Sequence, residues 1–146
     1  MKRSMEQVFE EILLLNFQKN YMKLQEIGLY PGQEIILGYI IHHEGGIQSE
    51  LVSHTKKKSS TIARAIQRME QAGYICRKKD EKDKRMYHLY TTHLGKETYD
   101  KITELKKQEC EYYSHLFTEE EKNNICSYLI RVRDSLKGVQ QNEKNR

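Results

Sequence analysis

The feature that most constrains the fold is a change of hydrophobic period at Gly73. Before this glycine, apolar residues recur at the spacing i, i+3, i+4, i+7 from Ile62 to Met69, which is typical of one buried helix face. After it, residues 74–79 and 86–91 are short runs rich in aromatic and apolar strand formers, separated by a charged tip. This change predicts a helix that ends at Gly73 and is followed by a two-stranded hairpin.

The residues before this helix complete a recognisable unit. A short helix is expected to begin at Gln48, and a basic turn leads from it into the helix that ends at Gly73. Ser59 or Ser60 is a good N-cap for that second helix, and Gly73 suits the C′ position. Two helices joined by a turn and followed by a hairpin with a basic tip predict a winged helix-turn-helix. Ile47, just upstream, is expected to pair briefly with the hairpin.

The second helix carries hydroxyl, amide and guanidinium groups opposite its apolar face. Such groups can hydrogen-bond base edges and phosphates, whereas lysines in the preceding turn and at the hairpin tip suit phosphate contact. The alternative for each set is an ordinary solvated surface. The candidate DNA-binding residues of these three segments are Lys56, Lys57, Lys58, Ser59, Ser60, Thr61, Arg64, Gln67, Arg68, Lys82, Lys84 and Arg85.

Charge is concentrated in the same part of the chain. Between Gln48 and Tyr90 there are eleven Lys and Arg residues against five Asp and Glu, a net charge of +6. The whole chain carries +4, so the remaining residues sum to −2. A basic segment of this kind is the electrostatic footprint expected of a nucleic-acid-binding module.

The order and spacing of these residues resemble the MarR (multiple antibiotic resistance regulator) family over nearly the whole chain. The family pattern differs at residues 56–58, where a glycine and an apolar residue are usual, and at Thr55 and Thr91, where leucine is commoner. The resemblance implies that Asp83 orients Arg85 in the wing, which adds Asp83 to the candidate DNA-binding residues. The matching segments are Gly28-Leu29-x-Pro31-x-Gln33, Gln48-Ser49-Glu50-Leu51, Ser60-Thr61-Ile62 with Arg64, Gly73, Asp83-x-Arg85 and Thr92-x-x-Gly95.

Helices are also expected on both sides of this unit. Residues 4–27 and 32–43 each carry a wide apolar face, the second almost wholly apolar and therefore central. A helix over 93–117 is expected to follow a Thr92 N-cap. A capping box at Thr118 predicts a last helix that ends at Lys137-Gly138, with residues 140–146 as a frayed polar tail.

The expected fold class is mainly α with a small β-hairpin: a winged helix-turn-helix flanked by a helical dimerisation bundle. We assign residues 31–91 to DNA binding and residues 1–30 with 92–146 to dimerisation, because the terminal helices are too apolar for a monomer's surface. The resemblance likewise implies an obligate homodimer. The alternative is that these helices pack within one chain.

Other chemistries receive less support from the sequence. No catalytic motif was found, and neither an enzyme nor a cofactor is expected. His42-His43-Glu44 suggests a metal, but neighbouring helical residues diverge by about 100°, and no metal is expected. Cys76, Cys110 and Cys126 are expected to be buried structural residues, with redox sensing as the alternative. An odd number of scattered cysteines suits a reducing cytosol.

The resemblance also implies an effector crevice, although aromatic residues at helical spacing are more often core. We therefore expect a sequence-specific transcription regulator, a repressor, that binds a pseudopalindromic operator in duplex DNA as a cytoplasmic homodimer and is released by a small ligand. No association with a membrane is expected. The alternative is a winged-helix module for RNA or protein binding. The speculative ligand-binding residues are Phe17, Tyr21, Tyr39, His43 and Tyr112.

Overall fold

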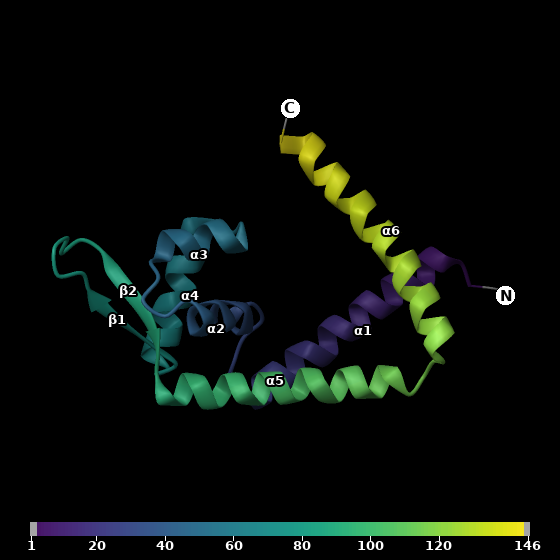
Figure 1. The fold of residues 1–146 in the computed structure, drawn as a ribbon, viewed down its shortest axis with the longest axis horizontal. Coiled ribbons are helices and arrows are strands. Elements are labelled where there is room, and N and C mark those ends of the chain that lie inside the picture. Colours follow the sequence, from purple (N-terminus) through teal and green to yellow (C-terminus); the bar gives the residue numbers. More distant parts are fainter. Residues whose placement is uncertain (1–2, 145–146) are drawn as a thin grey trace. The chain divides into compact units, whose positions relative to one another are not determined.

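The computed structural model describes residues 3–144 of the 146-residue chain. The described part contains six helices and one two-stranded antiparallel sheet, so the expected fold class is confirmed (Figure 1). None of these helices combines the length and apolar character that a membrane-spanning segment needs. The elements in chain order are α1 (Met5–Glu26), α2 (Gln33–His42), α3 (Gln48–Thr55), α4 (Ser59–Gln71), β1 (Ile75–Lys79), β2 (Tyr87–Thr91), α5 (His93–Ser114) and α6 (Glu119–Lys144).

The chain forms two compact units, residues 1–104 and residues 105–146. The first unit holds the core, in which α2, α3, α4 and the hairpin bury their apolar faces against one another. At about 25 cal/mol per Å² of apolar surface removed from water, such burial is the main stabilising contribution. The side chains that are almost fully enclosed are Leu29, Leu37, Ile40, Leu51, Ile62, Ile66, Met69 and Ile75.

The connection between α4 and β1 follows the expectation for Gly73. Gly73 has φ +84°, and its N–H donates to the Glu70 carbonyl at 3.0 Å. The Tyr74 N–H donates to the Met69 carbonyl at 3.0 Å, which completes a Schellman motif. The predicted N-cap was wrong by one residue: Lys58 caps α4 without a side-chain bond, and both serines lie inside the helix.

The hairpin of β1 and β2, residues 75–91, is called the wing below. Its strands pair from Ile75 with Thr91 to Lys79 with Tyr87. The predicted pairing of Ile47 is confirmed, because it forms an antiparallel bridge with His88. The α2–α3 connection therefore lies along β2, where the Gly45 N–H donates to the Leu89 carbonyl and the Leu89 N–H donates to the Gly46 carbonyl.

The central place expected for α2 is confirmed, because Ile36, Leu37 and Ile40 are buried in the core, although Ile35 is 51% exposed. Two expected helix ends need correction. Helix α5 ends at Ser114 rather than at residue 117, because Thr118 must leave helical geometry to cap α6. There the Glu121 N–H donates to the Thr118 hydroxyl at 3.3 Å. Helix α6 passes through Gly138 to Lys144, since a single glycine weakens a helix by about 1 kcal/mol without removing its hydrogen bonds. The expected frayed tail is thus helical as far as Lys144, and residues 145–146 lie outside the described residues.

The start of α5 is packed tightly against the end of α4. The Thr92 hydroxyl accepts from the Gly95 N–H at 3.0 Å and donates to the Gly73 carbonyl at 2.5 Å, so the predicted N-cap is confirmed. A Cβ on Gly95 would lie 2.1 Å from the Tyr74 carbonyl oxygen, which explains why only glycine fits there. These contacts fix the wing and α4 relative to the first turns of α5.

Candidate DNA-binding surface

Helix α4 divides cleanly into two faces. Ile62, Ile66 and Met69 are buried, and Ala65 is half-buried against the same core. The opposite side is exposed and includes Ser59, Ser60, Thr61, Arg64, Gln67 and Arg68. Every candidate residue on this helix is therefore accessible to a partner, and the hydroxyls lie in the first turn.

The turn between α3 and α4 is built from three exposed lysines. Lys56 adopts a left-handed conformation with φ 54° and ψ 21°, and its N–H donates to the Val52 carbonyl at 3.0 Å. The ammonium group of Lys57 leans over the start of α2, since a Cβ on Gly32 would lie 3.1 Å from its Nζ. Lys58 is the N-cap of α4. The three exposed lysines thus lie at the entry to α4.

The turn of the wing, residues 80–86, is organised by two carboxylates. The Asp80 Oδ1 atom accepts from the N–H groups of Lys82 and Asp83, each at 2.8 Å. The Asp83 carboxylate accepts from the Arg85 backbone N–H at 3.0 Å. Because the acids bind backbone amides, the side chains of Lys82, Lys84 and Arg85 are left exposed.

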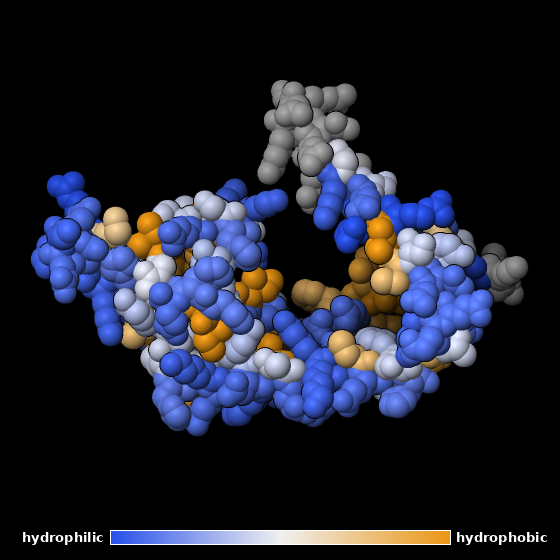
Figure 2. All heavy atoms as spheres, viewed as in Figure 1, coloured by the Kyte–Doolittle hydropathy of each residue, from blue (hydrophilic) through white to orange (hydrophobic). Residues whose placement is uncertain are grey.

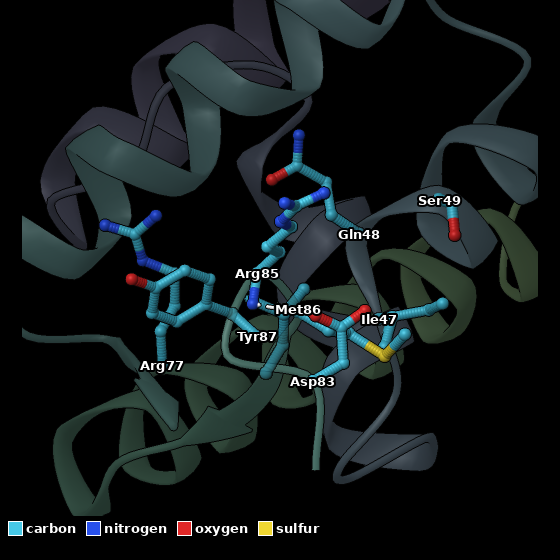
Figure 3. Close-up of a pocket in the computed structure, with 9 residues that line it drawn as sticks. Ile47, Gln48, Ser49, Arg77, Asp83, Arg85, Met86 and Tyr87 are labelled. Carbon is cyan, nitrogen blue, oxygen red and sulfur yellow. Dashed lines mark hydrogen bonds between the residues drawn. The ribbon is translucent and has the colours of Figure 1, made fainter. Parts of the chain in front are cut away.

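The relation between Asp83 and Arg85 differs from a simple ion pair. Figure 3 shows the dashed contact between the Asp83 carboxylate and the Arg85 backbone nitrogen, while the Arg85 side chain extends toward Gln48. The acid therefore fixes the main chain from which Arg85 projects. Arg85 lines a pocket together with Gln48 and Ser49, which lie at the start of α3.

Sequence reasoning missed a salt bridge that joins the wing to α4. Glu70, in the last turn of α4, accepts from Arg77 on β1 at 2.8 Å from Nε and 2.7 Å from Nη2. The same guanidinium lies 5.3 Å from the centre of the Tyr87 ring on β2. The contact of Arg77 with Tyr87 depends on the register of β1 with β2, which the sequence alone did not predict.

A second missed residue is His88 on β2. Its Nε2 lies 2.8 Å from the Asp80 Oδ2, and its Nδ1 lies 2.6 Å from the Gly45 carbonyl oxygen. These two contacts raise the pKa of His88 above 6.5, the Asp80 bond having the larger effect. Hydrogen bonds from the Asp83 N–H, the His88 ring and the Lys82 N–H lower the pKa of Asp80 from 3.8 to about 2.

The structure brings together only part of the speculative ligand set. The rings of Tyr39 and His43 stack with their centres 4.2 Å apart, and the centre of the His54 ring lies 4.6 Å from that of Tyr39. Phe17 and Tyr21 lie one turn apart on α1 and are 61% and 37% exposed. Tyr112 is exposed in the second unit.

Metal and cysteine chemistry have little geometric basis in the described part of the chain. Within residues 3–144, no three His, Cys, Asp or Glu side chains converge as a metal site. His42 and His43 each contact the carbonyl four residues earlier, at 2.6 and 2.8 Å. Cys76 is half-buried, whereas Cys110 and Cys126 are exposed thiols, so the expectation that all three cysteines are buried was wrong.

Comparisons with known proteins agree with this geometry. The MarR family model matches residues 27–86. HTH-type transcriptional regulator YybA of Bacillus subtilis is 32% identical over 115 residues, covering 79% of this chain and 77% of that protein. A MarR protein from Peptoclostridium difficile is 29% identical in sequence, with a TM-score of 0.72 over 94% of this chain and 92% of its own.

A likeness in fold extends to a DNA complex. The S. aureus MepR–DNA complex has a TM-score of 0.73 over 92% of this chain and 99% of its own, at 20% identity. The winged helix-turn-helix geometry, the family match and the YybA relative lead to one conclusion. The chain belongs to the MarR family of helix-turn-helix transcription regulators, which are regulators and not enzymes.

Proposed function

We propose that this protein binds a pseudopalindromic operator in duplex DNA as a homodimer and represses transcription from it. The observation that carries the proposal is the exposed polar face of α4 beside the exposed cations of the wing. Helix α4 would enter the major groove with its N-terminal half, as second helices of helix-turn-helix proteins do. The wing would then lie on the neighbouring backbone.

Each element has a distinct role in this proposal. Arg64 lies one turn into α4 and would read a base edge, while Ser60 and Thr61 would approach bases or phosphates from the first turn. Arg68, Lys84 and the turn lysines would neutralise phosphates. Arg85 would enter the minor groove, where arginine reads groove width as well as charge. The S. aureus MepR–DNA complex, which shares the fold, supports duplex DNA as the partner.

Dimerisation would use residues 1–30 and 92–146, with residues 31–91 kept for DNA. The described part of α1 buries Leu24 alone, although it carries many apolar residues (Figure 2). In α6, Leu129 and Leu136 are 50% and 59% exposed. Apolar faces of this size on a monomer mark protein interaction sites, and a second copy supplies a matching face.

An effector would act by changing the distance between the two α4 helices of the dimer. Half-sites lie about 34 Å apart, one turn of DNA, so a small change in spacing lowers operator affinity. The Tyr39–His43 stack offers an aromatic surface for such a ligand, with Phe17, Tyr21 and Tyr112 as the other candidates. As a DNA-binding repressor, the protein would work in the cytoplasm, where a bacterial chromosome lies.

The test starts from a pool of random duplexes from which the protein selects its own site. We expect selection of a sequence with two-fold symmetry, and lower transcription in vitro from a promoter that contains it. Arg64→Ala should relax the selection at the base pair that Arg64 reads in each half-site, with Lys101→Ala on α5 as an exposed cation control. A protein that binds no duplex at low salt, or that binds RNA instead, would overturn the proposal.

A further inference from the structure

His88 makes two hydrogen bonds that a neutral imidazole cannot make together. Its ring nitrogens face the Gly45 carbonyl at 2.6 Å and the Asp80 carboxylate at 2.8 Å. The backbone carbonyl oxygen can only accept, and so can the Asp80 carboxylate, whose pKa is lowered to about 2. Neutral imidazole has a single N–H, whereas imidazolium has two. The geometry therefore matches His88 in its protonated form.

The two bonds connect parts of the DNA-binding unit that are far apart in sequence. Gly45 belongs to the α2–α3 connection, where its N–H donates to the Leu89 carbonyl at 2.8 Å. Asp80 begins the wing turn and holds the N–H groups of Lys82 and Asp83. His88 thus ties the turn that carries the wing cations to the connection that leads into α3.

The charges around His88 favour its protonated form. Asp80 faces it from the wing turn, and Glu50 on α3 also raises its pKa. On the α2–α3 connection, Glu44 accepts from the Thr91 N–H at 3.1 Å. Lys78 is the paired residue on β1, but its ammonium lies over the Tyr90 ring, 4.7 Å from the centre. The charged groups near His88 are therefore acidic apart from Lys78, whose ammonium lies over the Tyr90 ring.

We propose that His88 is a positioning residue for DNA binding, which as an imidazolium holds the wing turn against the α2–α3 connection and releases it on deprotonation. The inference rests on the proposed function, since the wing cations matter only if they contact DNA. On loss of the proton, one ring nitrogen becomes an acceptor facing an oxygen, so one of the two bonds is broken. The charge attraction to Asp80 is lost at the same time.

The sign of the pH dependence follows from the direction of the pKa shift. A histidine whose pKa is raised in the folded protein stabilises the structure fully below its ordinary value of 6.5. That contribution is lost as the pH rises through the higher folded value. Asp80 stays ionised throughout this range. Duplex affinity is therefore expected to fall as the pH rises through the folded pKa of His88, which lies above 6.5, and not as the pH falls below 6.5.

Asp80→Asn separates this role from a merely structural one. The asparagine amide can donate to the unprotonated Nε2, so a neutral His88 would keep both contacts, with Nδ1–H donating to Gly45. The variant should retain its affinity at alkaline pH, where the wild type loses it. His88→Gln should bind about three- to tenfold more weakly at neutral pH, the equivalent of one hydrogen bond, with no further alkaline loss. His115→Gln, an exposed histidine in the turn after α5, is the matched control.

The experiment has two readouts on the full-length protein. Nitrogen-15 NMR of the histidine rings reports whether both His88 nitrogens carry protons near neutral pH, without any DNA. Fluorescence anisotropy then measures affinity across pH for a duplex selected by the wild-type protein. We expect both nitrogens of the His88 ring to carry protons. Duplex affinity should fall at alkaline pH in the wild type and in His115→Gln, and it should stay constant there in Asp80→Asn and His88→Gln.

Three results would overturn the inference. A single protonated nitrogen on His88 near neutral pH removes its basis, whatever the DNA measurements give. A doubly protonated ring with identical pH profiles in all four proteins removes the positioning role and leaves the proposed function intact. Failure to bind any duplex, with the ring still doubly protonated, removes the proposed function and with it the positioning role.

Discussion

Helices α4 and α1 use their apolar residues in opposite ways. In α4, Ile62, Ile66 and Met69 are all buried within one copy of the chain, and the remaining surface is polar. In α1 only Leu24 is buried, while Leu13, for example, stays 54% exposed. The comparison indicates that the DNA-binding unit is folded by its own residues, whereas α1 leaves most of its apolar residues exposed, where the proposed dimer would cover them.

The largest effect is expected from the core under α4. Ile66→Ala removes a side chain that is 1% exposed, and it should lower the free energy of unfolding by about 2–5 kcal/mol. Urea unfolding followed by circular dichroism measures the change. Gln67→Ala, the exposed neighbour, should stay within about 0.5 kcal/mol of the wild type. Equal losses in both variants would mean that the two faces of α4 are assigned wrongly.

A charge on α1 tests the other half of the comparison. Leu13→Glu places a carboxylate on a face that the proposed dimer buries, and it should raise the dimer dissociation constant about a hundredfold, roughly 2.8 kcal/mol. Sedimentation at several protein concentrations measures this. Gln18→Glu adds the same charge at a polar, exposed position and should raise the dimer dissociation constant much less. If both variants sediment as the wild type does, the apolar surface of α1 does not hold the dimer.

This contrast explains why some features were predictable from the sequence. The faces of α4, the strands of the wing and the Thr92 N-cap follow from period and from local capping chemistry, which act over a few residues. The N-cap of α4 was misplaced because two serines offered side-chain caps, whereas the backbone of Lys58, with ψ 140°, makes the turn unaided. Local capping preferences alone could not decide between the two serines and Lys58.

The parts that escaped prediction depend on contacts between different elements. His88 meets Gly45 across 43 positions, and Glu70 on α4 meets Arg77 on β1 across seven. A hydrophobic pattern identifies the strands, but only their register decides which polar side chains face each other. The exposure of Ile35 escaped for a related reason, since composition does not tell which side of α2 lacks a neighbour.

The polar face of α4 is expected to divide into base-reading and phosphate-binding residues. Arg64→Ala should weaken binding to the selected duplex by about 1–3 kcal/mol, and binding to random duplex much less, because an arginine–guanine pair discriminates by that amount. Lys84→Ala should weaken both equally and reduce the salt slope by about one unit. Anisotropy titrations over a salt series provide the data. Equal losses on both duplexes for Arg64→Ala would place the base-reading face elsewhere.

The smallest effect concerns the turn that leads into α4. Lys56 has φ 54°, in the left-handed region that costs a residue with a Cβ about 1–2 kcal/mol. Lys56→Gly removes this strain but adds backbone freedom to the unfolded chain, so the net gain in stability should be about 0.5 kcal/mol. Lys57→Gly, at a position without positive φ, gains nothing and should be slightly destabilised.

The same pair of variants separates the stability of this turn from its role in binding. Lys56→Gly and Lys57→Gly each remove one positive charge near the entry to α4, so each should bind duplex more weakly and with a salt slope smaller by about one unit. Thermal unfolding should nevertheless give Lys56→Gly a higher melting temperature than the wild type and Lys57→Gly a lower one. If Lys56→Gly unfolds at a lower temperature than Lys57→Gly, the left-handed conformation at Lys56 is not strained. In that case the lysine side chain must itself stabilise the turn between α3 and α4.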